Sequence, residues 1–125
     1  MATLTSDFFE NTPINVPWTI VRGDTGRLRI DFLENDEVTP FDTSSWEFAA
    51  SSYDAKGDVA DELEVNIGNG YVEIVAPSDI TIGWGDGFSS TVARLAFDLQ
   101  IVIGDNIWTP IVGTITVAGN ITGVL

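Results

Sequence analysis

The sequence predicts an all-β domain, an antiparallel sandwich or barrel of about seven or eight short strands. Three observations lead to this fold class. Apolar and polar residues alternate in the clearest segments, as in Leu95–Ile103, and a period of two is typical of a half-buried strand. Turn-forming residues separate these segments at short intervals. No window of the sequence keeps apolar residues at helical spacing.

Three strands are expected in the first half of the chain. The first covers residues 17–21 and leads into a glycine-containing turn at residues 22–26. In residues 27–32 large apolar residues alternate with arginine and aspartate, so one face of this strand should be buried. An acidic loop at residues 34–37 follows. The third strand is expected at residues 46–50, where tryptophan, phenylalanine and alanine share one face.

Two hairpins are expected in the second half of the chain. Residues 63–67 and 71–76 flank a Gly-Asn-Gly turn, and residues 93–103 and 107–117 flank a Gly-Asp-Asn turn. Both turn sequences contain residues that tolerate a positive φ. Residues 80–84, between the hairpins, fit either a short strand or a single helical turn.

A single β-sandwich domain is expected at residues 15–125, preceded by an N-terminal arm at residues 1–14. The length of 125 residues fits one domain. The arm carries clusters of turn-forming polar residues, so we expect it to be extended with little regular structure. Phe8 and Phe9 are adjacent in it, and two such rings need cover from water. They either fold back on their own domain or insert into a neighbouring subunit.

The net charge of −14 limits the partners that the chain can have. It arises from 19 acidic and 5 basic residues. Phosphate backbones are bound by clustered lysine and arginine, so we expect no nucleic acid partner, and an anionic membrane surface is disfavoured for the same reason. No apolar run approaches the roughly 18 residues of a membrane span. The acidity predicts either solubility at high local concentration or docking onto a basic partner surface.

Catalytic, cofactor and metal sites are not expected. The sequence contains no histidine and no cysteine, which removes the commonest catalytic bases, the cysteine nucleophile and nearly all transition-metal sites. An enzyme that hydrolyses glycosides with two carboxylates stays an alternative. Calcium is compatible with the composition, but the acidic loop at residues 34–37 lacks the alternating ligand spacing of a calcium loop. We therefore expect a protein without enzymatic activity.

Trp84 and Trp108 are the tryptophans that we expect at the surface, because both lie beside or near predicted loops. Trp18 and Trp46 are in phase with apolar neighbours on their strands and are expected in the core. Exposed tryptophans can stack on a carbohydrate or lie in a protein interface, and we expect the interface. The candidate interface residues are therefore Phe8, Phe9, Trp84 and Trp108.

Asp98 is the acidic residue inside the clearest apolar strand. It shares a face with Arg94, Ala96 and Gln100. If that face is solvated, the carboxylate needs no partner. If the face is covered, Asp98 requires a partner such as Arg27, Arg29 or Arg94. We expect a structural hydrogen-bonding role for Asp98.

Four short segments, taken in their order along the chain, resemble a known family. They are V-R-G-D-T at Val21–Thr25, D-T-S-S-W-E-F-A-A at Asp42–Ala50, F-D-L-Q-I at Phe97–Ile101 and G-T-I-T-V at Gly113–Val117. Their order resembles the amino-terminal domain of phage baseplate upper proteins and related small virion proteins of tailed phages. The resemblance spans about residues 15–122. It implies an immunoglobulin-like β-sandwich that docks on virion components and has no catalytic residues.

We therefore expect a non-enzymatic structural protein of a tailed-phage virion, assembled in the host cytoplasm. It would be a homo-oligomer or present in many copies per particle. It would dock on other phage virion proteins through protein–protein contacts, at the tail or baseplate, at the head–tail attachment or as a capsid decoration. The alternative is a carbohydrate-binding β-sandwich module, which requires two or more exposed aromatic rings in one plane.

Overall fold

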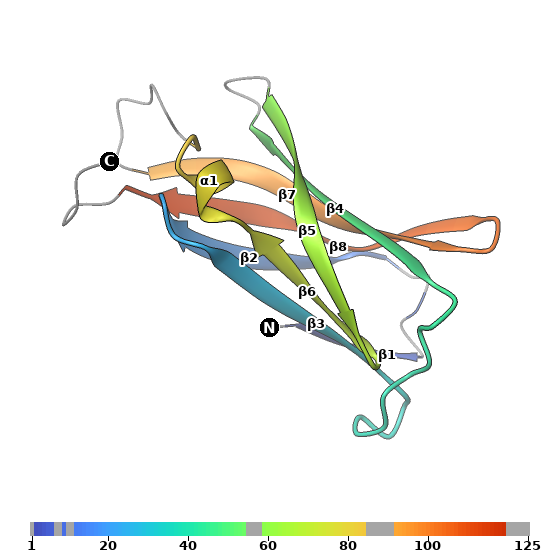
Figure 1. Cartoon of the computed structure of the whole chain (residues 1–125). Coiled ribbons are helices and arrows are strands. Elements are labelled where there is room, and N and C mark those ends of the chain that lie inside the picture. Colours follow the sequence, from blue (N-terminus) through green and yellow to red (C-terminus); the bar gives the residue numbers. More distant parts are fainter. Residues whose placement is uncertain (1, 7–8, 10–11, 55–58, 85–91, 120–125) are drawn as a thin grey trace.

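The computed structural model describes residues 2–6, 9, 12–54, 59–84 and 92–119. Strands dominate this part of the chain, and one short helix lies between β6 and β7 (Figure 1). The elements are β1 (Ala2–Thr5), β2 (Ile14–Val21), β3 (Gly26–Leu33), β4 (Glu47–Asp54), β5 (Val59–Gly68), β6 (Tyr71–Ala76), α1 (Ser78–Thr81), β7 (Val92–Ile103) and β8 (Asn106–Ala118).

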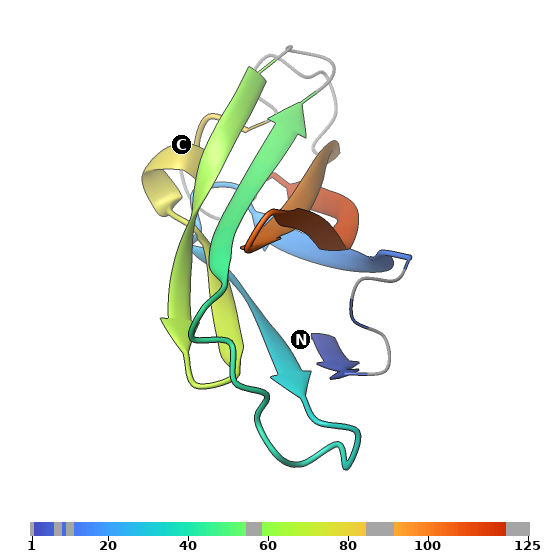
Figure 2. The ribbon, with the colours of Figure 1, turned by 90° about the vertical axis from the view of Figure 1, so that its right-hand side faces the viewer.

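The strands form one mixed sheet in the order β1-β3-β6-β5-β4-β7-β8-β2. The sheet curls until it is nearly barrel-shaped, and it does not divide clearly into the two sheets of an immunoglobulin sandwich (Figure 2). The all-β prediction is confirmed. The prediction of a wholly antiparallel arrangement is wrong, because β1 pairs in parallel with β3 and β2 pairs in parallel with β8. Both parallel pairs join strands far apart in sequence, and alternation within a strand carries no information about such partners.

The core lies inside the curled sheet and contains the alternating apolar residues that the sequence predicts. On β7, Leu95, Phe97, Leu99 and Ile101 are all buried. The alternation on β2 and β3 is confirmed in the same way, since Trp18, Ile20, Leu28, Ile30 and Phe32 are buried as well. The period of two therefore identifies the inner face of each of these strands.

Two prolines within strands lie at positions where the missing backbone N–H removes little hydrogen bonding from the sheet. Pro17 belongs to β2, the last strand in the order of the sheet, so one edge of β2 has no strand beside it. Pro110 lies in β8 opposite a register shift between Leu99 and Ile101 of β7. A β-bulge of this kind breaks the ladder locally and accepts a residue that cannot donate a hydrogen bond.

The N-terminal segment contains a strand that the sequence analysis missed. β1 pairs with β3 from Ala2↔Ile30 to Thr5↔Leu33, and Leu4 is a buried member of the core. The expectation of little regular structure in the arm at residues 1–14 is therefore wrong for Ala2–Thr5. The boundary at residue 14 and the contact with a neighbouring subunit stay predictions.

Residues 80–84 do not form a strand: the helical turn α1 (Ser78–Thr81) includes residues 80 and 81, and residues 82–84 continue as a turn. The helix α1 follows Pro77, and hydrogen bonds connect it and the residues after it to the turn between β2 and β3. The Thr81 hydroxyl donates a hydrogen bond to the Asp24 carbonyl oxygen at 2.7 Å, and the Arg22 Nε donates to the Trp84 carbonyl oxygen at 2.7 Å. Among the described residues, no helix has the length and hydropathy needed to cross a membrane.

Gly113 lies where β8 passes between β2 and β7. It pairs with Val16 on β2 and with Phe97 on β7. A Cβ at this position would overlap the Val16 carbonyl oxygen and lie 2.7 Å from the Phe97 Cε1. The obstacle includes backbone that is held in the sheet, so glycine is required here by close approach.

Replacing Gly113 with alanine should lower the free energy of unfolding by about 1–3 kcal/mol, because the added methyl group must displace β2 or the Phe97 ring. Equilibrium unfolding in denaturant measures the change. Gly83→Ala is the matched control, since its added Cβ would lie 3.7 Å from the nearest atom, the Ile80 carbonyl oxygen. Equal unfolding midpoints for the two variants would contradict the close packing at Gly113.

Candidate functional site

A cluster of aromatic rings surrounds the end of β3 and contains two of the candidate interface residues. Phe9 lies with its ring centroid 4.8 Å from that of Phe41 and 5.4 Å from that of Trp108. Phe9 also contacts Phe32 and Trp46 edge to face. Of the two alternatives for the Phe8–Phe9 pair, Phe9 therefore folds back on its own domain. Phe8 lies outside the described residues.

The two tryptophans expected at the surface are buried within the chain. Trp84 is 3% exposed, and its indole Nε1 donates a hydrogen bond to Asp61 Oδ2 on β5 at 3.0 Å. Trp108 is 6% exposed and lies in the aromatic cluster. The expectation of exposure is wrong for both, because segments distant in sequence cover rings that lie beside local turns. Their assignment to an interface stays a prediction.

Burial of Trp84 and Trp108 removes the feature on which the carbohydrate alternative rested. Stacking on a sugar needs aromatic faces that are open to solvent. The structure brings Phe9 together with Trp108 and places Trp84 beside α1, so these rings do not form a common exposed platform. Among the described residues, no group of three or more acidic side chains could hold a metal ion.

A shallow hollow of about 390 Å³ surrounds Asp98 on the outer face of the sheet. Residues from β2, β4, β5, β7 and β8 line it, and small side chains such as Ala60 and Ala96 make up much of its surface. Partial burial raises the pKa of Asp98 above its usual range. Two of the expected arginine partners are engaged elsewhere: Arg27 pairs with Glu73 and Arg29 with Asp31, each at 2.9 Å. Among the described residues, no ion pair reaches Asp98.

Replacing Asp98 with asparagine should increase stability relative to the unchanged chain at pH 7 but not at pH 3. A raised pKa means that the folded state favours the protonated carboxyl. The stability that Asp98 contributes is therefore complete below the unfolded pKa and is lost as the pH rises through the folded pKa. Asparagine stays neutral and avoids this loss. Denaturant midpoints of both chains at the two pH values measure the difference, and a difference that does not vary with pH would contradict the prediction.

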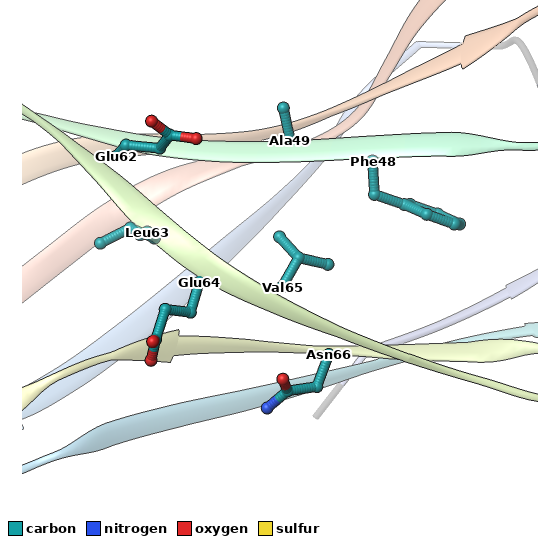
Figure 3. A pocket seen from close by; sticks show the side chains of 7 residues that line it. All are labelled: Phe48, Ala49, Glu62, Leu63, Glu64, Val65 and Asn66. Atoms are coloured by element: carbon teal, nitrogen blue, oxygen red, sulfur yellow. The ribbon is translucent and has the colours of Figure 1, made fainter.

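A second hollow, of about 470 Å³, lies where β4 and β5 separate. Its lining combines three apolar residues with two acidic residues, an alanine and an asparagine (Figure 3). Leu63 is buried, Phe48 and Val65 are half-buried against the core, and the polar side chains are exposed. The lining residues are Phe48, Ala49, Glu62, Leu63, Glu64, Val65 and Asn66.

The sequence analysis did not identify this second hollow, which we name the β4–β5 cleft. Alternation predicts the inner face correctly for Leu63 and Val65, which pack toward the core, but not for Ile67, which is 62% exposed. The cleft exists because β5 changes partner along its length, from β4 to β6. The alternation of a strand shows which face is buried but not where its pairing with one neighbour ends, so the cleft leaves no local signal in the sequence.

Comparison with known proteins gives likenesses to solved structures and no family, and two of these structures are described below. No family model matches the chain, and no curated protein matches it. The N-terminal domain of phage TP901-1 ORF48 is 13% identical, with 96% of this chain and 99% of that chain covered and a TM-score of 0.41. The bradyzoite-specific antigen BSR4 from Toxoplasma gondii is 9% identical, with 92% and 46% covered and a TM-score of 0.39. Both TM-scores lie below 0.5, so neither likeness carries a functional argument.

Proposed function

We propose that this chain is a non-enzymatic structural protein of a tailed-phage virion that docks on other virion proteins through protein–protein contacts. The observation that carries the proposal is the order of the four sequence segments that resemble phage baseplate upper proteins. In the structure these segments lie at the end of β2, at the start of β4, in β7 and in β8. Since β4, β7, β8 and β2 are consecutive in the sheet, the four segments belong to one continuous half of it.

The position of the four segments supports a structural interpretation of the resemblance. Phe97, in the third segment, pairs with Gly113 in the fourth, and Ala50, in the second, pairs with Leu99. These residues set the register and packing of adjacent strands. They form a scaffold, and a scaffold acts through the surfaces that it presents to partners.

The proposal includes no catalytic activity and no cofactor. The chain has no histidine or cysteine, so acid–base catalysis would depend on its carboxylates. Asp98 is the described carboxylate whose pKa is raised, and it lies on a shallow open face among small side chains. A glycosidase pair would need a second carboxylate at the matching distance across a cleft.

We further propose that the protein occurs in many copies per particle or as a homo-oligomer, in a virion assembled in the host cytoplasm. A net charge of −14 makes identical copies repel each other. Contacts between copies would therefore be mainly apolar and through the backbone, and attachment to a different virion protein would supply the rest.

Mass spectrometry of purified virions tests this proposal. The particles are separated into heads and tails, and peptides of this chain are quantified in each fraction against a known capsid protein. We expect the chain in the particles at a fixed copy number and in one of the two fractions. Its presence in the infected-cell lysate together with its absence from purified particles would overturn the proposal.

A further inference from the structure

The β4–β5 cleft contains two strand segments that each lack a neighbour on one edge among the residues that the structure describes. The β4–β5 pairing runs from Asp54↔Val59 to Ala50↔Leu63 and stops there, although both strands continue. Beyond that point β5 pairs with β6, and β4 pairs with β7 on its other side. Figure 1 shows the two strands together at one end and apart at the other.

Each of these segments therefore has a paired edge and an edge that faces the cleft. The segments are Glu47–Ala49 of β4 and Glu64–Gly68 of β5, and no pairing joins them. Along a strand, backbone N–H and C=O groups point to both edges, so some of these groups face the cleft from either side. Open edges of this kind accept an added strand by backbone hydrogen bonding.

The side chains of the cleft divide into an apolar inner layer and an acidic outer layer. Phe48 and Val65 pack toward the core, and Figure 3 shows both in the space between the two ribbons. Glu62 and Glu64 alternate with these inner residues along β5 and are exposed, and the described residues that line the cleft include no lysine or arginine. A strand placed here would meet apolar side chains on one face and carboxylates on the other.

We propose that the β4–β5 cleft binds an extended segment of a different protein, in which apolar residues alternate with lysine or arginine. The segment would add as a strand between β4 and β5, with its apolar side chains on Phe48 and Val65 and its basic side chains beside Glu62 and Glu64. This inference rests on the proposed function in one respect only, that the partner is a virion protein.

Charge complementarity favours a different protein over a second copy of this chain. The chain has only five basic residues. Its own segment that alternates basic and apolar residues is β3, which already pairs with β1 and β6. The arginines of β3 are also engaged, Arg27 with Glu73 and Arg29 with Asp31. A second copy therefore has no free segment of this kind among its described residues.

Binding of a synthetic peptide to the full chain tests the proposal. The probe is a blocked peptide of alternating lysine and valine, about seven residues long, which is enough to span Glu64–Gly68 at about 3.3 Å per residue. Titration calorimetry measures affinity, and amide hydrogen exchange locates the contact. We expect saturable binding with new protection at residues 47–49 and 64–68. Protection confined to other segments, or the absence of saturable binding, would overturn the proposal.

Matched variants and peptides separate strand addition from simple charge attraction. E62Q/E64Q should weaken binding about tenfold, while E34Q/E37Q, which removes equal charge from an exposed loop, should leave it unchanged. A peptide with every second amide N-methylated keeps its charge but loses backbone donors, and it should not bind. Equal binding of the methylated peptide, or equal loss in both double variants, would contradict strand addition.

Measuring whether the chain and its E62Q/E64Q variant are incorporated into virions tests this inference separately from the proposed function. If virions contain the chain but the peptide does not bind and E62Q/E64Q is incorporated normally, docking through the cleft is wrong and the virion role stands. If the chain is absent from virions but the peptide binds at the cleft, the virion role is wrong and the cleft stands. Dimerisation of the chain that E62Q/E64Q alters would identify a second copy as the occupant and overturn the choice of partner.

Discussion

Replacing Phe32 with alanine should lower the free energy of unfolding by about 3–5 kcal/mol, one of the two largest effects that we expect. Phe32 is fully buried at the centre of the aromatic cluster. Its ring centroid lies 5.3 Å from that of Trp46, 6.0 Å from that of Phe9 and 6.3 Å from that of Trp108. Removing the ring leaves a cavity. The neighbouring rings belong to several different segments, so they cannot all move inward to fill it.

Equilibrium unfolding in denaturant, followed by tryptophan fluorescence, measures the effect of Phe32→Ala. Two of the neighbouring rings are tryptophans, so their emission reports directly on the cluster. The control is Val38→Ala in the loop after β3, where the side chain is 78% exposed and the expected change is below about 0.5 kcal/mol. Equal unfolding midpoints for the two variants would show that the aromatic cluster does not contribute the expected stability.

Removing residues 1–9 should destabilise the isolated chain by about 3 kcal/mol or more. The deletion takes away β1, the buried Leu4 side chain and the Phe9 ring that covers Trp108. It also exposes the edge of β3 that β1 covers, which invites pairing between molecules. An extended arm at residues 1–14 predicts little loss of stability on its removal, whereas the pairing of β1 and the burial of Leu4 predict a large loss.

Thermal unfolding together with sedimentation separates the two consequences of this deletion. Leu4→Ala removes the core contact while keeping the strand, and Thr3→Ala changes an exposed neighbour on the same strand. We expect Leu4→Ala to lower the Tm strongly and Thr3→Ala to leave it nearly unchanged. A shortened chain that is monomeric and as stable as the full one would show that β1 contributes nothing to the fold.

The sequence predicts the strands best where alternation is long and both ends have turn residues. Residues 93–103 and 107–117 were expected as a hairpin, and β7 and β8 form it with Leu95 opposite Ile115. The inner faces of β2 and β3 follow from the same pattern. These features depend on the residue itself and its near neighbours, which is the information that a single sequence contains.

The features that the sequence does not predict depend on which strands and side chains come together in the fold. β1 has only four residues, too few for alternation to stand out, and its partner β3 begins at Gly26. Trp84 and Trp108 lie beside turns, and distant residues such as Asp61 and Phe9 cover them. The β4–β5 cleft arises where β5 leaves one partner for another. For β1 and the two tryptophans the deciding partner is remote along the chain. For the cleft the partners are the neighbouring strands β4 and β6, and no sequence pattern marks the point where each pairing ends.

The parallel pairing of β2 with β8 has a consequence for how the chain folds during synthesis. Its register joins Ile14 to Ile111 and Val21 to Ala118, so β2 can pair only after a much later segment has been synthesised. Loop closure over such a separation is entropically costly, and a topology rich in these contacts folds slowly, in milliseconds to seconds. Until β8 leaves the ribosome, β2 has no ladder to join and its apolar face stays uncovered. Translation itself therefore sets the earliest time at which the sheet can be completed.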